Sequence, residues 1–465
     1  MPLDPLLLDP ALFAARQLQF HPEPRQKEML RLSSKRVILN CSRQCGKSTI
    51  TAIIAIHRAH HFSKSLILVV TPSGRQSAEF VRKLEDFLPR LGLTLKGDGD
   101  NRISVLFPNG SRIVGLPANE DTCRGFSGVD LLIIDEASRV PDRMYDSVLP
   151  MIASGAGGSL WLLSTPNGRT GFFYDVWSGQ DTQWQRISVP ASECPRISKK
   201  FLAEMRRTRT TDIFNQEYGC EFLNAEASAF RDTWLESAVT TAISPLGKPD
   251  APTANFFPRK FCDFYVGLDL GQRMDYAAIS IIERTLVMFP EKDYSTYQHK
   301  WEFQYRLRYL ERLPLGTTYL DIIRHVRDLC QHPAFEDRCT VVVDASGVGL
   351  PIVEMLRRDL LNCRLEPVTI TSGRKTRHDH DGWLTPRREL IQTLALHLEQ
   401  NRIRIPANIP HLDHLKQELR NISVVTCQPA HSQVHDDLAI ATALAVWKAF
   451  QSCPTANPYI LARCI

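Results

Sequence analysis

Long hydrophobic runs are missing from this sequence, which excludes two classes of protein. No stretch reaches the roughly 18 uninterrupted apolar residues that a membrane-spanning helix needs. The first twenty residues, MPLDPLLLDPALFAARQLQF, lack a basic segment and carry Asp4 and Asp9, which argues against a secretory signal. We therefore expect a protein that is neither embedded in a membrane nor exported, and that works in the cytoplasm.

Closely spaced cysteine pairs and a strong net charge are also missing. The 12 cysteines are scattered without any C-x-x-C pair, so neither a zinc ribbon nor a disulfide framework is indicated, and we expect reduced thiols. The 56 basic and 51 acidic residues leave a formal charge of only +5. Any affinity for nucleic acid must therefore come from local basic patches.

Length and composition indicate an ordinary folded protein with more than one domain. The 465 residues are 23% charged and 43% hydrophobic, and such a chain usually forms two domains. Residues 237–260 contain four prolines and little periodicity, which predicts a linker. We expect one domain over residues 1–236 and a second over residues 261–465.

The segment from Cys41 to Ser48, CSRQCGKS, matches the phosphate-binding pattern G-x-x-x-x-G-K-[ST] except at its first glycine. An apolar run at residues 36–40 predicts a buried strand before it, and residues 48–61, which lack Gly and Pro, predict a helix after it. This context favours a nucleotide-binding loop over a surface turn that happens to read Gly-Lys-Ser. The predicted ATP-binding residues of the loop are Ser42, Arg43, Gln44, Cys45, Gly46, Lys47, Ser48 and Thr49.

Two further apolar runs end in polar residues that suit ATP hydrolysis. The run at residues 131–134 ends in Asp135 and Glu136, and we predict that Asp135 holds Mg²⁺ while Glu136 polarises the attacking water. An acidic strand end without catalytic meaning is the competing interpretation. The run at residues 159–163 ends in Ser164 and Thr165, whose hydroxyls can sense a γ-phosphate. Upstream, Gln26 is a candidate adenine contact, although a solvated glutamine is equally compatible with the pattern.

A second group of carboxylates lies beyond the expected linker. Asp269 and Asp344 each close an apolar strand-like run, and Asp436 and Asp437 begin an alanine-rich helical segment. Taken singly, such acids are ordinary turn or helix-capping residues. Together they fit a site that holds two Mg²⁺ or Mn²⁺ ions for phosphodiester hydrolysis.

Short basic segments offer a track for a polyanion such as DNA. Most runs of this kind are only solvated faces, so DNA contact is favoured here because a phosphodiester site is predicted as well. The segments consist of Lys199, Lys200, Arg206, Arg207 and Arg209; of Arg374, Lys375, Arg377 and His378; and of Arg387 and Arg388.

The order of these motifs resembles the large terminase subunit of tailed bacteriophages, an ATP-driven DNA-packaging motor joined to a ribonuclease H-like nuclease. The resemblance covers roughly residues 20–450. The segments that carry the resemblance are SRQCGKST, LLIIDEA, LLSTPNG, FNQEYGCEF, VGLDLG, VVVDASGVG and HDDLAIATALA. Members of this family often lack the first glycine of the phosphate loop, which accounts for Cys41.

For the ATPase, the resemblance implies that Lys47 and Ser48 bind phosphate and Mg²⁺, with Asp135 as the metal-associated acid and Glu136 as the catalytic one. It also implies that Ser164 and Thr165 couple hydrolysis to movement and that Gln26 belongs to the adenine-sensing motif. Arg124 and Arg43 are competing candidates for an arginine finger acting on a neighbouring subunit, and the sequence leaves this choice open.

For the nuclease, the resemblance implies that Asp269, Asp344 and one of Asp436 or Asp437 hold the metal ions. Asp437 is preferred because it aligns better with the acid preceding the alanine-rich helix, and a capping role is the alternative for Asp436. The implied partners are double-stranded DNA, a small terminase subunit and the portal of a procapsid, on which the chain would form a homo-oligomeric ring in the host cytoplasm.

The sequence therefore predicts an α/β protein with a P-loop ATPase domain, built on a mostly parallel sheet, and a ribonuclease H-like nuclease domain. Its predicted function is to translocate DNA into a procapsid and to cut it, with ATP and Mg²⁺ as cofactors. Two alternatives remain at this point. One is an ATP-dependent helicase or remodeler with a catalytically silent second domain, and the other is a scaffold that binds nucleotide only for assembly.

Overall fold

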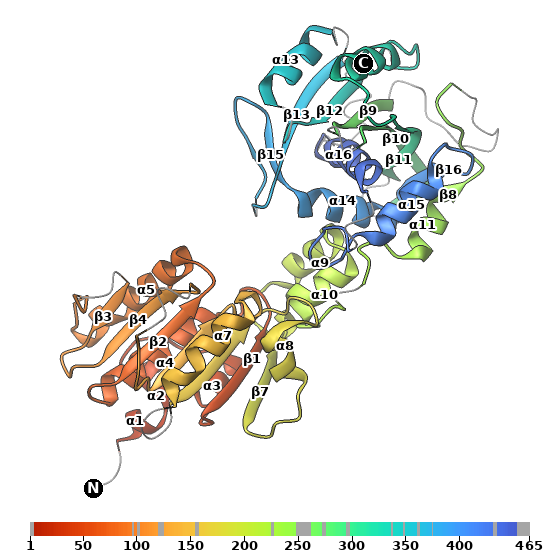
Figure 1. Ribbon diagram of the computed structural model, residues 1–465. Coiled ribbons are helices and arrows are strands. Elements are labelled where there is room, and N and C mark those ends of the chain that lie inside the picture. The colour runs from red at the N-terminus through yellow and green to blue at the C-terminus, as the bar shows by residue number, and fades with distance from the viewer. Residues whose placement is uncertain are drawn as a thin grey trace. The chain divides into compact units, whose positions relative to one another are not determined.

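The chain forms two compact units, Met1–Ala225 and Glu226–Ile465, each built around its own sheet (Figure 1). The division falls before the expected boundary at residue 236, because α11 (Asp232–Ala238) and β8 (Val239–Thr240) belong to the second unit. The computed structural model describes residues 4–452 except 95–96, 100–102, 120–124, 154–157, 225–226, 248–261, 272–275, 294–297, 336–337, 347–348, 360–362, 374 and 431–434.

The first unit contains a seven-stranded sheet in the order β3-β4-β2-β5-β6-β1-β7. All neighbouring strands run parallel except β3, which pairs antiparallel with β4. The mostly parallel sheet predicted from the sequence is therefore confirmed. The strands are β1 (Arg36–Cys41), β2 (Leu66–Thr71), β3 (Ser104–Leu106), β4 (Arg112–Pro117), β5 (Leu131–Asp135), β6 (Ser159–Ser164) and β7 (Trp184–Val189).

Helices cover both faces of this sheet, as the burial of alternate strand residues shows. Val37 and Leu39 of β1 pack into one core with α4 and α5, whereas Ile38 packs into a second core with α7 and α8. The helices are α1 (Pro5–Leu8), α2 (Pro10–Arg16), α3 (Pro24–Leu30), α4 (Lys47–His61), α5 (Gly74–Phe87), α7 (Asp142–Val148), α8 (Gly171–Ser178), α9 (Lys199–Thr208) and α10 (Thr211–Gly219), with short 3₁₀ turns η1 (Leu88–Leu91), η2 (Ala137–Arg139), η3 (Leu149–Ile152) and η4 (Ala191–Glu193).

The second unit contains a nine-stranded sheet in the order β14-β15-β13-β12-β9-β10-β11-β16-β8. In its centre β9, β10 and β11 form an antiparallel meander, and β12 and β13 continue it in parallel, as expected of a ribonuclease H-like domain. The strands after β8 are β9 (Cys262–Asp269), β10 (Ala278–Asp293), β11 (Gln298–Arg312), β12 (Cys339–Asp344), β13 (Cys363–Thr371), β14 (Arg377–His378), β15 (Trp383–Pro386) and β16 (Ile403–Pro406).

The helices of the second unit lie on both faces of its sheet. One core joins Phe264, Val266 and Leu268 of β9 to α12 and α13. On the other face, α16 packs against β9 and β10, and its residue Thr442 donates a hydrogen bond to Ser280 of β10 at 3.0 Å. The helices after α11 are α12 (Tyr319–Cys330), α13 (Gly349–Asp359), α14 (Arg387–Glu399), α15 (Leu412–Asn421) and α16 (Asp437–Gln451).

Gly267 allows the close approach of α16 to β9. A Cβ atom at this position would overlap the carbonyl oxygen of Ala441 and would lie 3.1 Å from the backbone nitrogen of Ala445. Both atoms are helix backbone and cannot rotate away, so a larger residue would push the helix off the strand. Because α16 begins at Asp437 and β9 ends at Asp269, this contact also helps to hold the two acids near each other.

We therefore expect Gly267→Ala to lower the free energy of unfolding of the second unit by roughly 1–3 kcal/mol, the usual cost of overpacking a core. Urea unfolding followed by circular dichroism measures this change. Gly373→Ala is the matched control in the same unit, since its Cβ would meet only the hydroxyl of Thr371 at 3.2 Å. Equal stability of the two variants would show that α16 can shift without cost.

Candidate functional sites

The phosphate loop connects the buried strand β1 to α4, as the sequence predicted. The loop enters the left-handed region of backbone space at Gln44 (φ 62°) and Gly46 (φ 89°), but not at Cys41. Cys41 is instead the buried last residue of β1. Its position needs no glycine backbone, and this explains how the loop forms without the first glycine.

Gly46 is required for its backbone conformation, and the ends of two side chains lie close to it. A Cβ there would lie 2.5 Å from Nε2 of Gln26 and 2.8 Å from Nη1 of Arg196. Gln26 is buried and donates from Nε2 to the carbonyl of Cys45 at 3.3 Å, while its Oε1 accepts from the backbone of Glu23 at 3.1 Å. Gln26 thus braces the phosphate loop from α3, and its contact with adenine remains a prediction.

Lys47 is buried at the start of α4 beside the predicted catalytic residue Glu136 and the predicted coupling residue Thr165. Its Nζ lies 3.0 Å from Oε1 of Glu136 and 3.4 Å from the hydroxyl of Thr165. Burial alone would lower the pKa of Lys47, but the nearby Glu136 and Asp135 carboxylates outweigh it and raise that pKa. The lysine therefore stays charged, as a phosphate-binding group must.

The two carboxyl groups at the end of β5 have different electrostatic surroundings. Burial raises the pKa of Asp135, although Lys47 and a hydrogen bond from Ser48 oppose the shift. Burial also acts on Glu136, but Lys47 outweighs it and the pKa of Glu136 falls. Glu136 has φ 54°, an uncommon backbone conformation that typically costs about 1–3 kcal/mol and is often found at active sites. It is therefore held ionised and in a strained position.

Ser164 and Thr165 at the end of β6 contact both sides of this cluster. The hydroxyl of Thr165 accepts from Lys47, and the hydroxyl of Ser164 lies 2.7 Å from that of Ser138 in η2. Ser138 also donates to the carbonyl of Thr165 at 2.8 Å. Ser138 follows Glu136 by two residues, so the network joins the phosphate loop to the turn that carries the catalytic acid. The sequence analysis did not single out Ser138.

The remaining loop residues are mostly buried or held by backbone contacts. Ser42 donates its backbone N–H to Val189 of β7, and Thr49 donates to Gly46 within the first turn of α4. Cys45 is buried, and its pKa is lowered to about 7, first by a hydrogen bond from Cys41. Because these residues form the framework of the loop, their predicted ATP contacts would come mainly from backbone groups.

Of the two candidate arginine fingers, the structure describes Arg43 but not Arg124. Arg43 is half-exposed, and its Nη2 lies 2.9 Å from Oε1 of Glu217 in α10. Glu217 belongs to the FNQEYGCEF segment, whose Gln216 accepts from Gly168 after β6 at 3.1 Å. Arg124 lies outside the described residues. The choice between the two arginines stays open.

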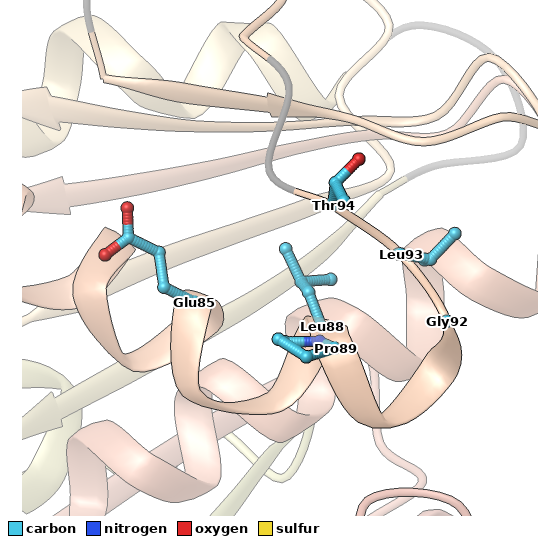
Figure 2. Close-up of a pocket in the computed structure, with 6 residues that line it drawn as sticks. All are labelled: Glu85, Leu88, Pro89, Gly92, Leu93 and Thr94. Carbon is cyan, nitrogen blue, oxygen red and sulfur yellow. The ribbon is translucent and has the colours of Figure 1, made fainter.

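A small cavity of about 90 Å³ opens beside the predicted Mg²⁺ ligands. Ser48, Asp135 and Glu136 form one wall, and α5 forms the other with side chains that include Gln76, Glu79 and Lys83. Sequence reasoning missed the α5 residues, because no motif connects them to the loop. A larger pocket of about 470 Å³ lies at the end of α5 and η1, but its lining residues belong to neither candidate site (Figure 2).

The predicted nuclease acids converge in the second unit. Parallel pairing aligns Val343 of β12 with Leu268 of β9, so Asp344 and Asp269 end adjacent strands at the same edge. Burial raises the pKa of Asp269 well above its usual range, and the neighbouring Asp344 and Asp437 raise it further. Burial also raises the pKa of Asp344, although hydrogen bonds from Ser346 oppose this. Asp344 and Asp437 are thus close enough to Asp269 to raise its pKa, and the assignment of the three acids as metal ligands stays a prediction.

Asp436 and Asp437 have different neighbours, although both stand at the start of α16. Asp436 occupies the cap position but makes no capping hydrogen bond, and its carboxylate instead pairs with Arg387 of α14. Asp437 is buried on the side of Asp269, with Nη2 of Arg312 at 3.9 Å from its Oδ2. This arrangement favours Asp437 as the third metal ligand.

Two residues at this site were missed or misassigned from the sequence. Glu418 of α15 is buried beside Asp437, accepts from the backbone of Ala439 at 2.8 Å, and has its pKa raised by burial to about 8. Arg387 was expected on a DNA-binding surface, but its guanidinium binds Asp436 and the carbonyl of Cys427. Neither residue belongs to a recognisable motif, because each contacts the start of α16 from a helix that is distant from it in sequence.

The acids of this cluster fit divalent cations. Asp269, Asp344, Asp437 and Glu418 are four carboxyl groups beside only two arginines, Arg312 and Arg387, and the raised pKa values of Asp269 and Glu418 show that the site would gain from an added cation. Carboxylate oxygens are the ligands that Mg²⁺ and Mn²⁺ prefer. In the described part of the chain, no three of these oxygens lie within 4.8 Å of one another.

The predicted basic segments are only partly at the surface. Lys199, Lys200, Arg206, Arg207 and Arg209 are exposed on or beside α9, and Lys375, Arg377 and His378 are exposed around β14. Arg374 lies outside the described residues. Within the described residues, no helix is both long and apolar enough to cross a membrane.

Comparison with known proteins finds similarity to phage terminase subunits. A family model described as terminase large subunit, T4likevirus-type, N-terminal, matches residues 38–237. The large terminase subunit of Thermus phage G20c is 23% identical over 478 residues, which cover 92% of this chain and 87% of that protein. The chain is thus similar to large terminase subunits over most of its length. The terminase ATPase subunit of Escherichia phage P2 is 22% identical, over 68% of this chain and 54% of that protein.

Solved terminase structures share the fold. The large terminase of a thermophilic bacteriophage aligns with a TM-score of 0.53 at 12% identity, covering 96% of this chain and 98% of that one. The same protein in complex with ATP-gamma-S gives a TM-score of 0.52 at 13% identity, with the same coverage. At this identity the similarity shows the α/β fold of the chain, and the roles of individual residues rest on the geometry of the two sites.

The Lys47 geometry predicts that Lys47→Ala lowers ATP turnover by about 100-fold or more, the usual effect of losing one electrostatic contact to a reacting group. Phosphate release measures turnover, and circular dichroism checks the fold. Lys27→Ala removes an exposed lysine of α3 from the same unit and should leave turnover unchanged. Normal turnover in a folded Lys47→Ala protein would reject the phosphate-loop assignment.

Glu136→Gln should separate ATP binding from hydrolysis. The substitution keeps the side-chain size but removes the charge that pairs with Lys47, so the lysine becomes freer to bind phosphate. We expect ATP affinity equal to or above that of the unchanged protein, and turnover lower by about 10²–10⁴-fold. Fluorescent-nucleotide titration and phosphate release measure the two quantities. Weakened ATP binding would mean that Glu136 supports the phosphate cradle instead.

Proposed function

We propose that this chain couples two chemistries, ATP hydrolysis in its first unit and DNA cleavage in its second. Its similarity to phage large terminases supports a function in phage DNA packaging, and a helicase or remodeler is not favoured. The same similarity supports ATPase activity. The observation that carries the two-site proposal is the pair of buried charge clusters, one around Lys47 and one around Asp269.

In the ATPase, each polar group at the sheet edge has a distinct task. Lys47 and the loop N–H groups bind the phosphates, and Ser48 and Asp135 would hold Mg²⁺. Bound Mg²⁺ would neutralise charge that develops on the phosphate oxygens. Glu136, ionised near Lys47, orients the attacking water and accepts its proton. When phosphate arrives, Lys47 exchanges its contact with Glu136 for one with phosphate.

The exchange of Lys47 contacts, from Glu136 to phosphate, offers a way to couple ATP hydrolysis to movement of the protein. Lys47 contacts Thr165, and Ser138 links Thr165 and Ser164 to the turn after Glu136. A change in the position of Lys47 is therefore transmitted to Thr165 at the end of β6 through one hydrogen bond, and from there to Ser138 through a second. We assign the coupling role to Ser164 and Thr165 on this basis and add Ser138 to the network.

In the nuclease, Asp269, Asp344 and Asp437 would hold two divalent ions, either Mg²⁺ or Mn²⁺. Bound ions would activate water and stabilise the leaving oxygen of a phosphodiester. Arg312 lies beside Asp437 and also pairs with Glu418, whereas Arg387 pairs with Asp436. In this assignment Asp437 is the ligand and Asp436 positions the start of α16.

The partners of the proposed motor are double-stranded DNA, a small terminase subunit and a procapsid portal, on which the chain would act as a homo-oligomeric ring. The exposed basic residues of α9 and β14 suit contact with DNA phosphates. Either Arg43 or Arg124 would stabilise transition-state charge in a neighbouring subunit. A nucleotide-binding scaffold is the remaining alternative, and ATPase activity stimulated by DNA would exclude it.

The two activities should separate cleanly, because each cluster lies within its own compact unit. Asp269→Asn keeps the side-chain size but removes one charge from the metal site, so Mn²⁺-dependent plasmid nicking should fall by about 100-fold or more. ATP turnover of the same preparation should persist. Asp413→Asn removes an exposed acid of α15 and is the control for a general effect of charge.

The same assay decides between the two acids at the start of α16. Asp437→Asn should abolish nicking, whereas Asp436→Asn should lower it less, because Asp436 acts through Arg387. Isothermal titration with Mn²⁺ distinguishes the roles, since loss of a ligand weakens metal binding directly. Full cleavage by the Asp269 variant would reject the nuclease site. Loss of both activities in that variant would reject the independence of the units.

A further inference from the structure

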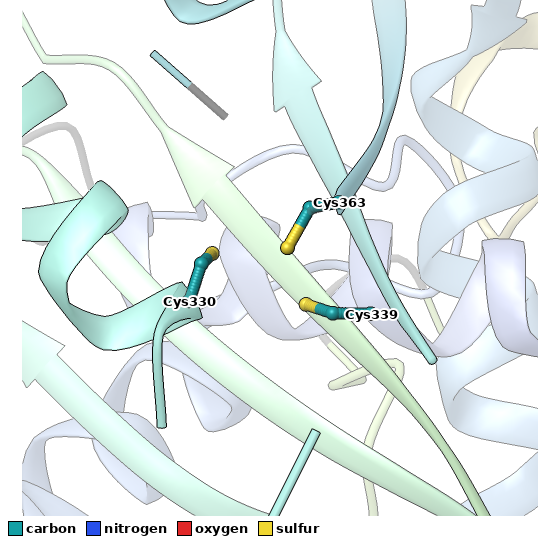
Figure 3. Close-up of side chains that lie close together, drawn as sticks. All are labelled: Cys330, Cys339 and Cys363. Atoms are coloured by element: carbon teal, nitrogen blue, oxygen red, sulfur yellow. The ribbon is translucent and has the colours of Figure 1, made fainter. Parts of the chain in front are cut away.

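Three cysteine side chains converge in the second unit, away from the carboxylate cluster. Cys330 ends α12, Cys339 begins β12 and Cys363 begins β13. Their sulfur atoms all lie within 4.8 Å of one another, and Figure 3 shows the three side chains pointing toward a common centre. They stand nine and 24 residues apart in sequence, a spacing that matches no zinc motif and so gave no signal.

We propose that Cys330, Cys339 and Cys363 form a site for a thiophilic metal ion, with Zn²⁺ as the ion that suits it best. A tetrahedral zinc–thiolate site has Zn–S distances of about 2.3 Å, which places its sulfurs about 3.8 Å apart. The three sulfurs therefore need only small movements to bind one ion. Binding would release the thiol protons to solvent, because the thiolate is the ligand.

The backbone already positions the three ligands. Cys339 and Cys363 are direct partners in the parallel pairing of β12 with β13. Cys330 approaches them from α12, whose residues Ile322, Ile323 and Val326 are buried in the same core. Cys330 and Cys339 are buried and Cys363 is half-buried, so the site is shielded but still open to an ion on the side of Cys363.

The described residues supply three ligands and leave a fourth position for water or another group. His332 is the nearest histidine along the chain to Cys330, but its Nδ1 accepts from the backbone of Ala334 at 3.2 Å. A zinc ion with three protein ligands and one further ligand is well within the known range of coordination. The arrangement therefore does not depend on a fourth protein side chain.

This site is distinct in place and in chemistry from the proposed nuclease centre. Cys339 and Asp344 occupy opposite ends of β12, which puts them roughly 17 Å apart at about 3.3 Å per residue. Thiolates select soft ions, whereas the carboxylates at the other end select Mg²⁺ or Mn²⁺. The thiol site would tie α12 to two strands of the sheet, one of which carries Asp344, and its role would be structural.

The test uses the full-length protein, purified with a reductant, stripped of metal and titrated with Co²⁺. Thiolate ligands give Co²⁺ a near-ultraviolet charge-transfer band, which carboxylate and imidazole ligands do not. The exposed group Asp379, His380 and Asp381 therefore cannot mimic the signal. We expect one equivalent of Co²⁺ to produce the band and Zn²⁺ to displace it. Zn²⁺ should also raise the midpoint of thermal unfolding.

The variants make the result specific. Cys363→Ser, at the half-buried ligand, should weaken Co²⁺ binding at least tenfold and abolish stabilisation by Zn²⁺, and Cys339→Ser should do the same. Cys262→Ser removes a half-buried thiol of the same unit that is not part of the cluster, and it should keep both responses. A normal circular dichroism spectrum and a cooperative urea unfolding transition of the second unit show that each variant is folded.

Three results would overturn the proposal. The first is the absence of a charge-transfer band in the unchanged protein. The second is a band of equal strength in the folded Cys363→Ser and Cys339→Ser variants, which would place the thiolate ligands elsewhere, for example at Cys41 and Cys45. The third is a disulfide between two of the three cysteines in protein purified without oxygen, detected by mass spectrometry of non-reduced peptides.

Discussion

Parallel pairing of strands is the constraint on which both sites depend. In the first unit, β5, β6 and β1 are neighbours that run in the same direction, so their carboxyl ends meet at one edge of the sheet. The phosphate loop, the two acids after β5 and the two hydroxyls after β6 then converge without further adjustment. The second unit repeats the principle with β9 and β12, whose last residues are the acids Asp269 and Asp344.

The buried charges at these sheet edges determine what each site can bind, and the two units neutralise their buried charges to different extents. In the first unit Lys47 lies beside Asp135 and Glu136, and the attraction between the lysine and the two acids offsets part of the cost of burying them. In the second unit the acids Asp269, Asp344, Asp437 and Glu418 outnumber the arginines near them. The first arrangement suits the exchange of a carboxylate for a phosphate, whereas the second suits the uptake of cations.

The sequence by itself determined the elements that carry the motifs. Short apolar runs ending in Gly-Lys-Ser or in acids predicted β1, β5, β9, β12 and the beginning of α16, because strand burial and helix starts are local properties. The family resemblance then ordered them into two domains. The linker expected at residues 237–260 shows the limit of this reasoning, since Val239 and Thr240 form β8 and pair with β16 in the second sheet.

Only the tertiary structure decided which side chains face one another. It turned Arg387 inward to Asp436, brought Glu418 to Asp437, joined Ser138 to Ser164, and gathered Cys330, Cys339 and Cys363 at the end of β12 opposite Asp344. None of these contacts has a sequence signature, because each joins segments whose separation along the chain bears no relation to their distance in space. Strand order and helix packing set those distances, and both are properties of the whole folded unit.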